Sequence, residues 1–244
     1  MFSEFLLPLD RQFDSGLMTT ANAFSDAATV INKDNNDKRL GLSGNQLPIF
    51  FLYRHAIELH FKSILTIIFR RFTPSYPQVD KEIFPTISVN SKKKRIFEVH
   101  SIKDLYNEFI SLLKKYETDI KQIAKTDWTN VPSEIIEWID IIDEADKAST
   151  MFRYPFTTDH ATDKMKSAFK QIPPEDIIKE NHTHNASGLQ GRMIFALKNE
   201  KNVIVEAFVR DDEPMKEVLN ALTHLADMLT GVNLGILCEL IKSK

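Results

Sequence analysis

The sequence has few of the residues that would place it in several common protein classes. Its 244 residues include one cysteine, Cys238, and seven glycines. A single cysteine excludes an internal disulfide and favours a reducing compartment. Few glycines, beside long segments of 3.6-residue periodicity, favour a mainly helical protein. The net charge of −3 and the pI near 6.2 give no overall attraction to nucleic acid or to an anionic membrane, so any contact with RNA has to be local.

Motifs of several enzyme classes are also missing. The chain has no phosphate-binding loop, no Gly-x-Ser-x-Gly elbow and no His-Glu-x-x-His zinc motif. His182 and His184 could share one face of an extended segment, but without a nearby cysteine or a third ligand they do not predict a metal site. No metal or cofactor is therefore expected. The stretch from Met1 to Leu9 carries Glu4 and lacks a basic start, so it does not resemble a secretory signal, and we expect a soluble cytoplasmic protein.

The most informative segment runs from Phe51 to Phe69, where three ionisable residues lie at four-residue intervals in an otherwise apolar stretch. On a helix, Arg54, Glu58 and Lys62 fall within a sector of about 80°. Apolar residues cover most of the remaining circumference, which predicts a helix enclosed by protein. The three charges would be costly in hydrocarbon, so no membrane span is expected here. Inside a protein core they need polar partners.

The other periodic segments predict a helical bundle. Helices are expected over residues 20–33, 46–72, 101 to about 125, from 132 onward, and 214–241. Ser101 is a good N-cap with an aspartate three residues on, and the basic run that precedes it, residues 91–95, is predicted to be a loop. Alternating stretches at 193–197 and 203–209, joined by polar residues, predict a β-hairpin. We expect a mainly α single domain over 1–244, with a small hairpin-containing insert at about 156–212.

These elements resemble the HEPN superfamily of small prokaryotic helical domains. The resemblance rests on the long terminal helix and on three patches: Tyr53-Arg54-His55-Ala56-Ile57-Glu58-Leu59 with Lys62, His100-Ser101-Ile102-Lys103-Asp104-Leu105, and Phe152-Arg153-Tyr154-Pro155. It implies a HEPN-like bundle and a metal-independent ribonuclease of the toxin or antiviral (phage) defence type, acting on RNA. Other members are noncatalytic, so a nucleotide-binding or protein-assembly module is the alternative. Since the terminal helix also carries more apolar positions than a surface helix needs, we predict a homodimer.

Active members of the superfamily carry an arginine followed, four to six residues later, by a histidine. Three pairs in this chain match that spacing: Arg54 and His60, Arg95 and His100, and Arg153 and His160. Roughly one match is expected by chance, so geometry has to rank them. The first pair lies about 120° apart on one helix and would face different sides, and a proline separates the third pair. The second pair precedes a helix start, where free N–H groups favour a phosphate, so we prefer His100 as the reactive histidine.

The residues and the resemblance together imply a mechanism without a metal. A neutral imidazole at His100 accepts the proton of a 2′-hydroxyl, and Arg54 or Arg153 stabilises the charge that grows on the phosphate. Glu58 orients the arginine and is balanced by Lys62, and the product is a 2′,3′-cyclic phosphate. The predicted catalytic residues, which we expect to converge from three segments, are Arg54, Glu58, His100 and Arg153. The predicted substrate-binding residues are Lys62, Lys93, Lys94, Arg95 and Tyr154.

Each of these assignments has a structural alternative. The charged stripe can be a network of ion pairs that fixes the helix register, and His100 can cap or lock the third helix. Arg153 can anchor a bend against Asp143 or Glu58, and the basic run before the helix can be a solvated loop. A basic cleft that converges on His100 and Arg54 would favour the nuclease. A stripe neutralised inside the core would favour the binding or assembly module.

Overall fold

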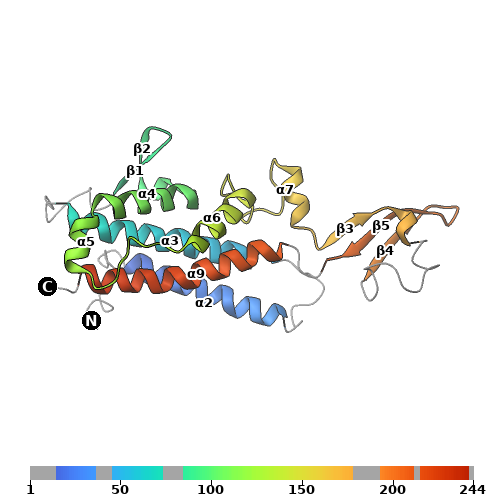
Figure 1. The fold of residues 1–244 in the computed structure, drawn as a ribbon. Coiled ribbons are helices and arrows are strands. Elements are labelled where there is room, and N and C mark those ends of the chain that lie inside the picture. The colour runs from blue at the N-terminus through green and yellow to red at the C-terminus, as the bar shows by residue number, and fades with distance from the viewer. Residues whose placement is uncertain (1–14, 37–45, 74–84, 178–192, 212–214, 242–244) are drawn as a thin grey trace.

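The computed structural model is mainly helical, which confirms the predicted mainly α character. It describes residues 15–36, 46–73, 85–177, 193–211 and 215–241. The helices form an elongated bundle, and a small β-sheet projects beyond one end of it (Figure 1). The central helix is α3 (Leu47–Phe72), which packs against α2 (Gly16–Asn36), α4 (Ile102–Lys115) and α9 (Lys216–Ile236). A further helix, α6 (Ser133–Ala145), packs on α9 and α4.

The central helix α3 is enclosed on nearly all sides, as its apolar circumference predicts. Proline stands in its first turn, where the missing N–H breaks no helical hydrogen bond. Each large apolar side chain that is fully buried stabilises the fold by about 1.5–3 kcal/mol. In α3 these side chains include Tyr53, Ile57, Phe61, Ile64, Leu65, Ile67 and Ile68. The bundle is thus built around α3, and the charged stripe of this helix lies at the centre of the molecule.

The third predicted helix is two helices, which corrects the expected continuation to about residue 125. The first, α4, begins after Ser101, whose hydroxyl oxygen accepts a hydrogen bond from the backbone N–H of Asp104 at 3.1 Å. It ends before Tyr116, which has non-helical φ and ψ of −107° and 19°. The second, α5, spans Glu117–Ile123. Periodicity did not predict the break, because the buried side chain of Ile120 continues the apolar pattern.

The predicted basic loop is also corrected, because its residues form a strand. Strand β2 (Lys92–Arg95) pairs antiparallel with β1 (Thr86–Val89). The connecting residues Asn90 and Ser91 have φ of 51° and 64°, and two consecutive positive φ values are typical of a tight hairpin turn. After β2 the chain passes through one short 3-10 turn, Ile96–Glu98, before α4 begins. The hairpin projects from the bundle beside α4 (Figure 1).

A three-stranded antiparallel sheet lies within the stretch predicted as an insert. Its strand order is β3 (Phe169–Ile172), β5 (Ile204–Arg210), β4 (Ile194–Lys198). The pair of β4 and β5 confirms the predicted hairpin, with an irregularity between Leu197 and Lys198. Strand β3 was not predicted, because its four residues show no alternation of apolar and polar side chains. The short helix α7 (His160–Met165) lies between the bundle and this sheet (Figure 1).

Helix α9 is a core element of the bundle. Most of its apolar residues are buried or partly buried as the helix packs on α3, α6 and α2, whereas Leu234 is 51% exposed. The buried positions do not by themselves require a second chain. Among the described residues, one helix has the length and hydropathy of a membrane span, Lys216–Leu240, and 44% of its apolar window is buried inside the protein. Core helices of soluble proteins have the same properties. The last turn, Leu237–Ile241, is a π-helix.

A carboxylate in this π-helical turn fixes the loop that follows α5. Glu239 Oε2 accepts hydrogen bonds from the indole Nε1 of Trp128 at 3.0 Å and from the backbone N–H groups of Lys125 and Thr126 at 3.1 and 3.2 Å. The Thr126 hydroxyl donates to Oε1 at 2.9 Å. Partial burial raises the pKa of Glu239, but these donors outweigh it and lower the pKa below its usual value. The loop is therefore tied to the end of α9 by a charged acceptor.

Gly235 gives the first testable prediction, because its missing side chain makes room for the Trp128 ring. A Cβ atom at Gly235 would lie 2.5 Å from Trp128 Cη2, whereas a Cβ at Gly231 would meet nothing within 4 Å. We expect Gly235→Ala to lower the free energy of unfolding by about 1–3 kcal/mol, since the indole and its bond to Glu239 must shift. Gly231→Ala is the matched control and is expected to be neutral or stabilising by up to about 1 kcal/mol. Equal effects in urea denaturation would contradict this packing.

Candidate functional site

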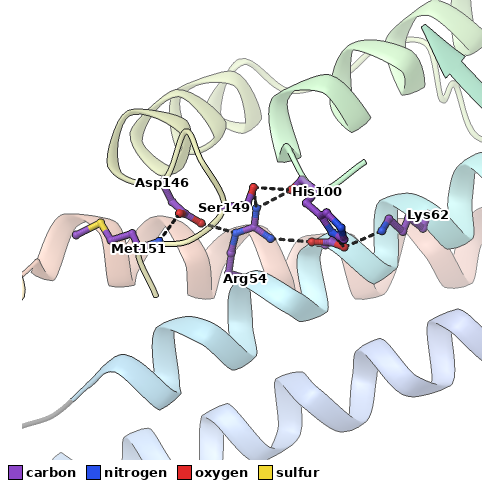
Figure 2. A network of polar contacts seen from close by, with 7 residues as sticks. Arg54, Lys62, His100, Asp146, Ser149 and Met151 are labelled. Atoms are coloured by element: carbon purple, nitrogen blue, oxygen red, sulfur yellow. Dashed lines mark hydrogen bonds and ion pairs between the residues drawn. The ribbon is translucent and has the colours of Figure 1, made fainter. Parts of the chain in front are cut away.

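Arg54 lies at the centre of a buried polar network that joins α3, the start of α4 and the loop after α6 (Figure 2). Its Nε donates to Asp146 Oδ2 at 2.6 Å and its Nη1 to Glu58 Oε2 at 2.8 Å. Its Nη2 donates to Ser149 Oγ and to the carbonyl oxygen of His100, both at 2.6 Å. The side chain is 3% exposed. Since arginine has five N–H donors and four hydrogen bonds are made inside the protein, this guanidinium is committed to holding neighbouring groups.

Glu58 is the acceptor on which three donors converge. Its Oε1 lies 2.7 Å from Lys62 Nζ and 2.9 Å from His100 Nδ1, and its Oε2 is paired with Arg54. Burial alone would raise the pKa of Glu58, but the adjacent Lys62 ammonium, the hydrogen bond from His100 and the Arg54 guanidinium lower it to about 2. The carboxylate is therefore ionised at neutral pH although it is almost fully buried.

The buried charges of the network balance one another. Arg54 and Lys62 are each 3% exposed, Glu58 is 1% exposed and Asp146 is 6% exposed, which gives two charges of each sign. Charges removed from water are tolerated when they are paired and hydrogen-bonded, and here every member has a partner at 2.8 Å or less. The predicted stripe is thus neutralised inside the core. Its interior position argues against the predicted contact of Lys62 with a substrate, because the ammonium cannot reach solvent.

Two members of the network, Asp146 and Ser149, were not predicted as site residues. Asp146 follows α6, and its Oδ1 accepts a hydrogen bond from the backbone N–H of Met151 at 2.8 Å while Oδ2 binds Arg54. Ser149 has φ of 57°, and its hydroxyl donates to the carbonyl oxygen of His100 at 3.1 Å. One signal existed in the sequence: the acidic residues of the fourth helix do not all fit on one solvent side. This excess of acidic residues indicates that one carboxylate faces the core, but it does not identify the residue.

His100 is the member of the network that reaches solvent. It lies just before the N-cap residue of α4, and 45% of its side chain is exposed, against 2% for Glu58. Because an ionised carboxylate only accepts hydrogen bonds, the Nδ1 atom that faces Glu58 carries the hydrogen. The other ring nitrogen, Nε2, then has a lone pair in the neutral ring, and within the described residues nothing hydrogen-bonds to it. This arrangement can hold a proton-accepting nitrogen at the protein surface in one fixed orientation.

Arg153 and Tyr154 are exposed and lie outside this network. Within the part of the chain that the structure describes, Arg153 makes no ion pair, so it does not anchor a bend against Asp143 or Glu58. Its charge acts instead on His55: burial lowers the pKa of His55, Glu58 raises it, and Lys62 and Arg153 lower it further. Arg54, Glu58 and His100 are therefore brought together, and Arg153 is near α3 without joining them.

The predicted substrate-binding residues separate into buried and exposed groups. Lys93, Lys94 and Arg95 are all exposed on β2, and Tyr154 is 56% exposed, with its carbonyl oxygen accepting a hydrogen bond from Lys166 at 3.0 Å. Since β2 ends at Arg95, only the short 3-10 turn and Val99 separate this basic strand from His100. This short connection therefore holds the basic strand and His100 close together in space.

A second buried polar cluster lies between α3 and α9, on another side of α3. His60 is 0% exposed; its Nε2 lies 3.2 Å from Thr230 Oγ1 and its Nδ1 lies 3.2 Å from Asn233 Nδ2. The Ser63 hydroxyl donates to Asn233 Oδ1 at 3.2 Å. Arg54 and His60 therefore face different sides of α3, as their spacing predicts, and burial lowers the pKa of His60 to about 4.

The stability of the protein is expected to fall in acid because of these buried groups. His60 titrates near pH 6.5 when unfolded and near 4 when folded, so the stability present above pH 6.5 is lost as the pH falls to about 4. This loss is on the order of 3 kcal/mol. Glu58, with its pKa lowered from 4.5 to about 2, adds a further loss below pH 4.5. Urea denaturation at several pH values measures both losses of stability. The variant His60→Asn should reduce the loss between pH 6.5 and about 4, whereas the control His224→Asn, at an exposed histidine, should leave it unchanged.

No metal site is evident in the described ranges, where no group of three or more His, Cys, Asp or Glu side chains could hold a metal ion. His182 and His184 lie outside the described residues. The chain matches no protein-family model, and comparisons with curated proteins and with solved structures gave no match. The geometry of the network is therefore the basis for a functional assignment.

Proposed function

We propose that the protein is a metal-independent endoribonuclease with a HEPN-like bundle, of the toxin or phage-defence type. The observation that supports this most is the pairing of His100 Nδ1 with the ionised carboxylate of Glu58 at 2.9 Å, while 45% of the histidine side chain remains exposed. A carboxylate that orients a histidine through one ring nitrogen leaves the other free to accept a proton. In this proposal His100 is the general base and Glu58 is its positioning residue.

The bonds made and broken in the proposed reaction involve the RNA, one basic nitrogen and solvent water. His100 Nε2 accepts the proton of a ribose 2′-hydroxyl, and the resulting oxygen attacks the adjacent phosphorus. The bond from phosphorus to the 5′-oxygen breaks, and this oxygen takes a proton from solvent water while the protonated His100 returns its proton to solvent. The products are a 2′,3′-cyclic phosphate and a 5′-hydroxyl, and His100 is neutral again. Arg54 positions Glu58 and the His100 main chain rather than the phosphate, because its donors are used inside the protein. The exposed cations Arg95 and Arg153 are the candidates to stabilise the phosphate charge.

The test is to incubate the purified protein with mixed RNA in the presence of EDTA and to analyse the ends of the products. We expect cleavage to fragments with 2′,3′-cyclic phosphates and 5′-hydroxyls. The variant His160→Ala, which changes an exposed histidine away from the network, is the control and should cleave like the wild type. RNA that stays intact, or cleavage that EDTA abolishes, would contradict the proposal.

A second candidate is a noncatalytic binding or assembly module. The observation that favours it is the complete pairing of the buried stripe, because a network that is neutral inside the core can fix helix register without doing chemistry. On this alternative His100 locks the start of α4 against α3. Intact RNA in the assay above, together with a dimer mass in light scattering at micromolar concentration, would support the module. A homodimer alone would fit both candidates.

A further inference from the structure

Strand β2 carries an unbroken row of positive charges. Lys92, Lys93, Lys94 and Arg95 are all exposed, and none makes an ion pair with the described residues. Residues 86–95 contain no acidic side chain. The nearest acid in the sequence, Glu98, accepts a hydrogen bond from the backbone N–H of Arg95 at 3.3 Å rather than from its guanidinium. The mutual repulsion of the four cations is therefore not relieved within this part of the protein.

The number of charges exceeds what an edge strand needs. In the two-stranded sheet β2 has one unpaired edge, and a lysine or two on such an edge is enough to prevent pairing with other chains. Four consecutive basic residues also place charge on both faces of the strand. In a strand that merely covers a core, polar and apolar side chains would alternate. This arrangement matches a polyanion, because a row of cations along an extended backbone can contact a row of phosphates.

The strand register divides the four cations between two faces. Residues opposite one another in an antiparallel pair lie on the same face. Lys93 is opposite Ser88 and Arg95 is opposite Thr86, and these four side chains are exposed. The other two lysines are opposite Ile87 and Val89, which are buried and turned toward the bundle. The face with Lys93 and Arg95 is therefore the open one, and its two cations lie two residues apart, at about 6.6 Å along the strand.

The hairpin lies within reach of His100. His100 is the fifth residue after Arg95, so the two Cα atoms are at most about 18 Å apart. The connection is held to the base of the hairpin, since the Ile96 N–H donates to the carbonyl oxygen of Pro85 at 3.1 Å. A nucleic-acid strand in contact with both would therefore span no more than about five nucleotides, at the rise of one strand in a duplex.

From these observations we propose that the open face of the β1–β2 hairpin, formed by Lys93, Arg95, Thr86 and Ser88, binds the phosphates of a single-stranded nucleic acid next to the bond presented to His100. The inference rests on the proposed function for its substrate, RNA, and names the form of that substrate as a single strand, of which no more than about five nucleotides lie between the hairpin and His100. Recognition through phosphates does not depend on the sugar, so a deoxy strand binds at the same face without being cleaved.

The test measures binding separately from cleavage. Fluorescence anisotropy with a labelled single-stranded DNA of about ten nucleotides gives the dissociation constant of the wild-type protein over a range of salt concentrations. Each phosphate contact contributes about 0.7 to the slope of log K against log salt for single strands. We expect the double variant Lys93→Gln with Arg95→Gln to weaken binding and to reduce this slope by about 1.4.

Two matched variants control for total charge. Lys92→Gln with Lys94→Gln removes the same charge from the other face of the strand and should change the slope less. Lys198→Gln with Lys201→Gln removes it from the exposed β4–β5 hairpin and should change nothing. An unaltered slope in the first variant, equal effects in all three, or binding of polyglutamate in place of the oligonucleotide would overturn the inference. Strand binding without RNA cleavage would reject the nuclease and leave the hairpin assignment in place.

Discussion

Arg54→Ala is expected to destabilise the protein more than any other single change in the network. The substitution removes one buried cation and leaves Glu58 and Asp146 incompletely paired in the core. Breaking a buried ion pair by removing one partner typically costs about 3–5 kcal/mol. For a chain of this length that corresponds to a melting temperature lower by about 10 °C. Thermal unfolding followed by circular dichroism measures the shift.

Arg153→Ala is the matched control for this prediction, because it removes an exposed arginine with no ion pair among the described residues. It should change the free energy of unfolding by no more than about 0.5 kcal/mol. Should Arg54→Ala not fold, Arg54→Lys keeps the charge but cannot bridge two carboxylates and a carbonyl oxygen, and an intermediate loss is expected. Equal stability of the wild type and both Arg54 variants would contradict the network.

His100→Ala is expected to abolish RNA cleavage while leaving the fold nearly unchanged. Removal of a general base usually lowers the rate by about 10² to 10⁴, and a half-exposed histidine at the surface contributes modestly to stability. The rate of RNA cleavage and the melting temperature are measured on the same preparation. If His100 is a structural lock instead, the melting temperature falls by several degrees, consistent with a loss of about 1–3 kcal/mol.

The contrast between Arg54 and His100 separates architecture from chemistry. Both residues bind Glu58, but one is buried and the other reaches solvent. The proposal predicts that Arg54 variants lose stability first and that His100 variants lose cleavage first. A wild-type protein that leaves RNA intact, with His100→Ala clearly destabilised, would reject the nuclease and favour the binding module.

The features that follow from helical periodicity and local capping could be predicted from the sequence. The 3.6-residue pattern of α3 predicts both its enclosure and the clustering of Arg54, Glu58 and Lys62 on one face. The same angles predict that His60 faces elsewhere, and it does, toward α9. Ser101 marks the start of α4 because an N-cap is a local interaction.

The parts that depend on contacts between distant segments could not be predicted. Asp146 and Ser149 enter the network only because a loop with positive φ at Ser149 turns back onto α3. Strand β2 has four basic residues and no alternation, so only its pairing with β1 makes it a strand. The pattern of α3 predicts its enclosure, but it does not show whether the charged face opens to solvent, and in the structure Lys62 on that face is buried.

The most direct measurement of the central claim is chemical rescue of His100→Ala by imidazole, in EDTA, with single-turnover kinetics on a single-stranded RNA. If the missing group is a proton-accepting imidazole held at the surface by Glu58, the cleavage rate of the variant should rise with imidazole concentration and return part of the lost activity. The wild type should be unaffected, and RNA with imidazole alone gives the background. A variant whose cleavage rate stays at that background at every imidazole concentration, beside an active wild type, would contradict a general-base role for His100.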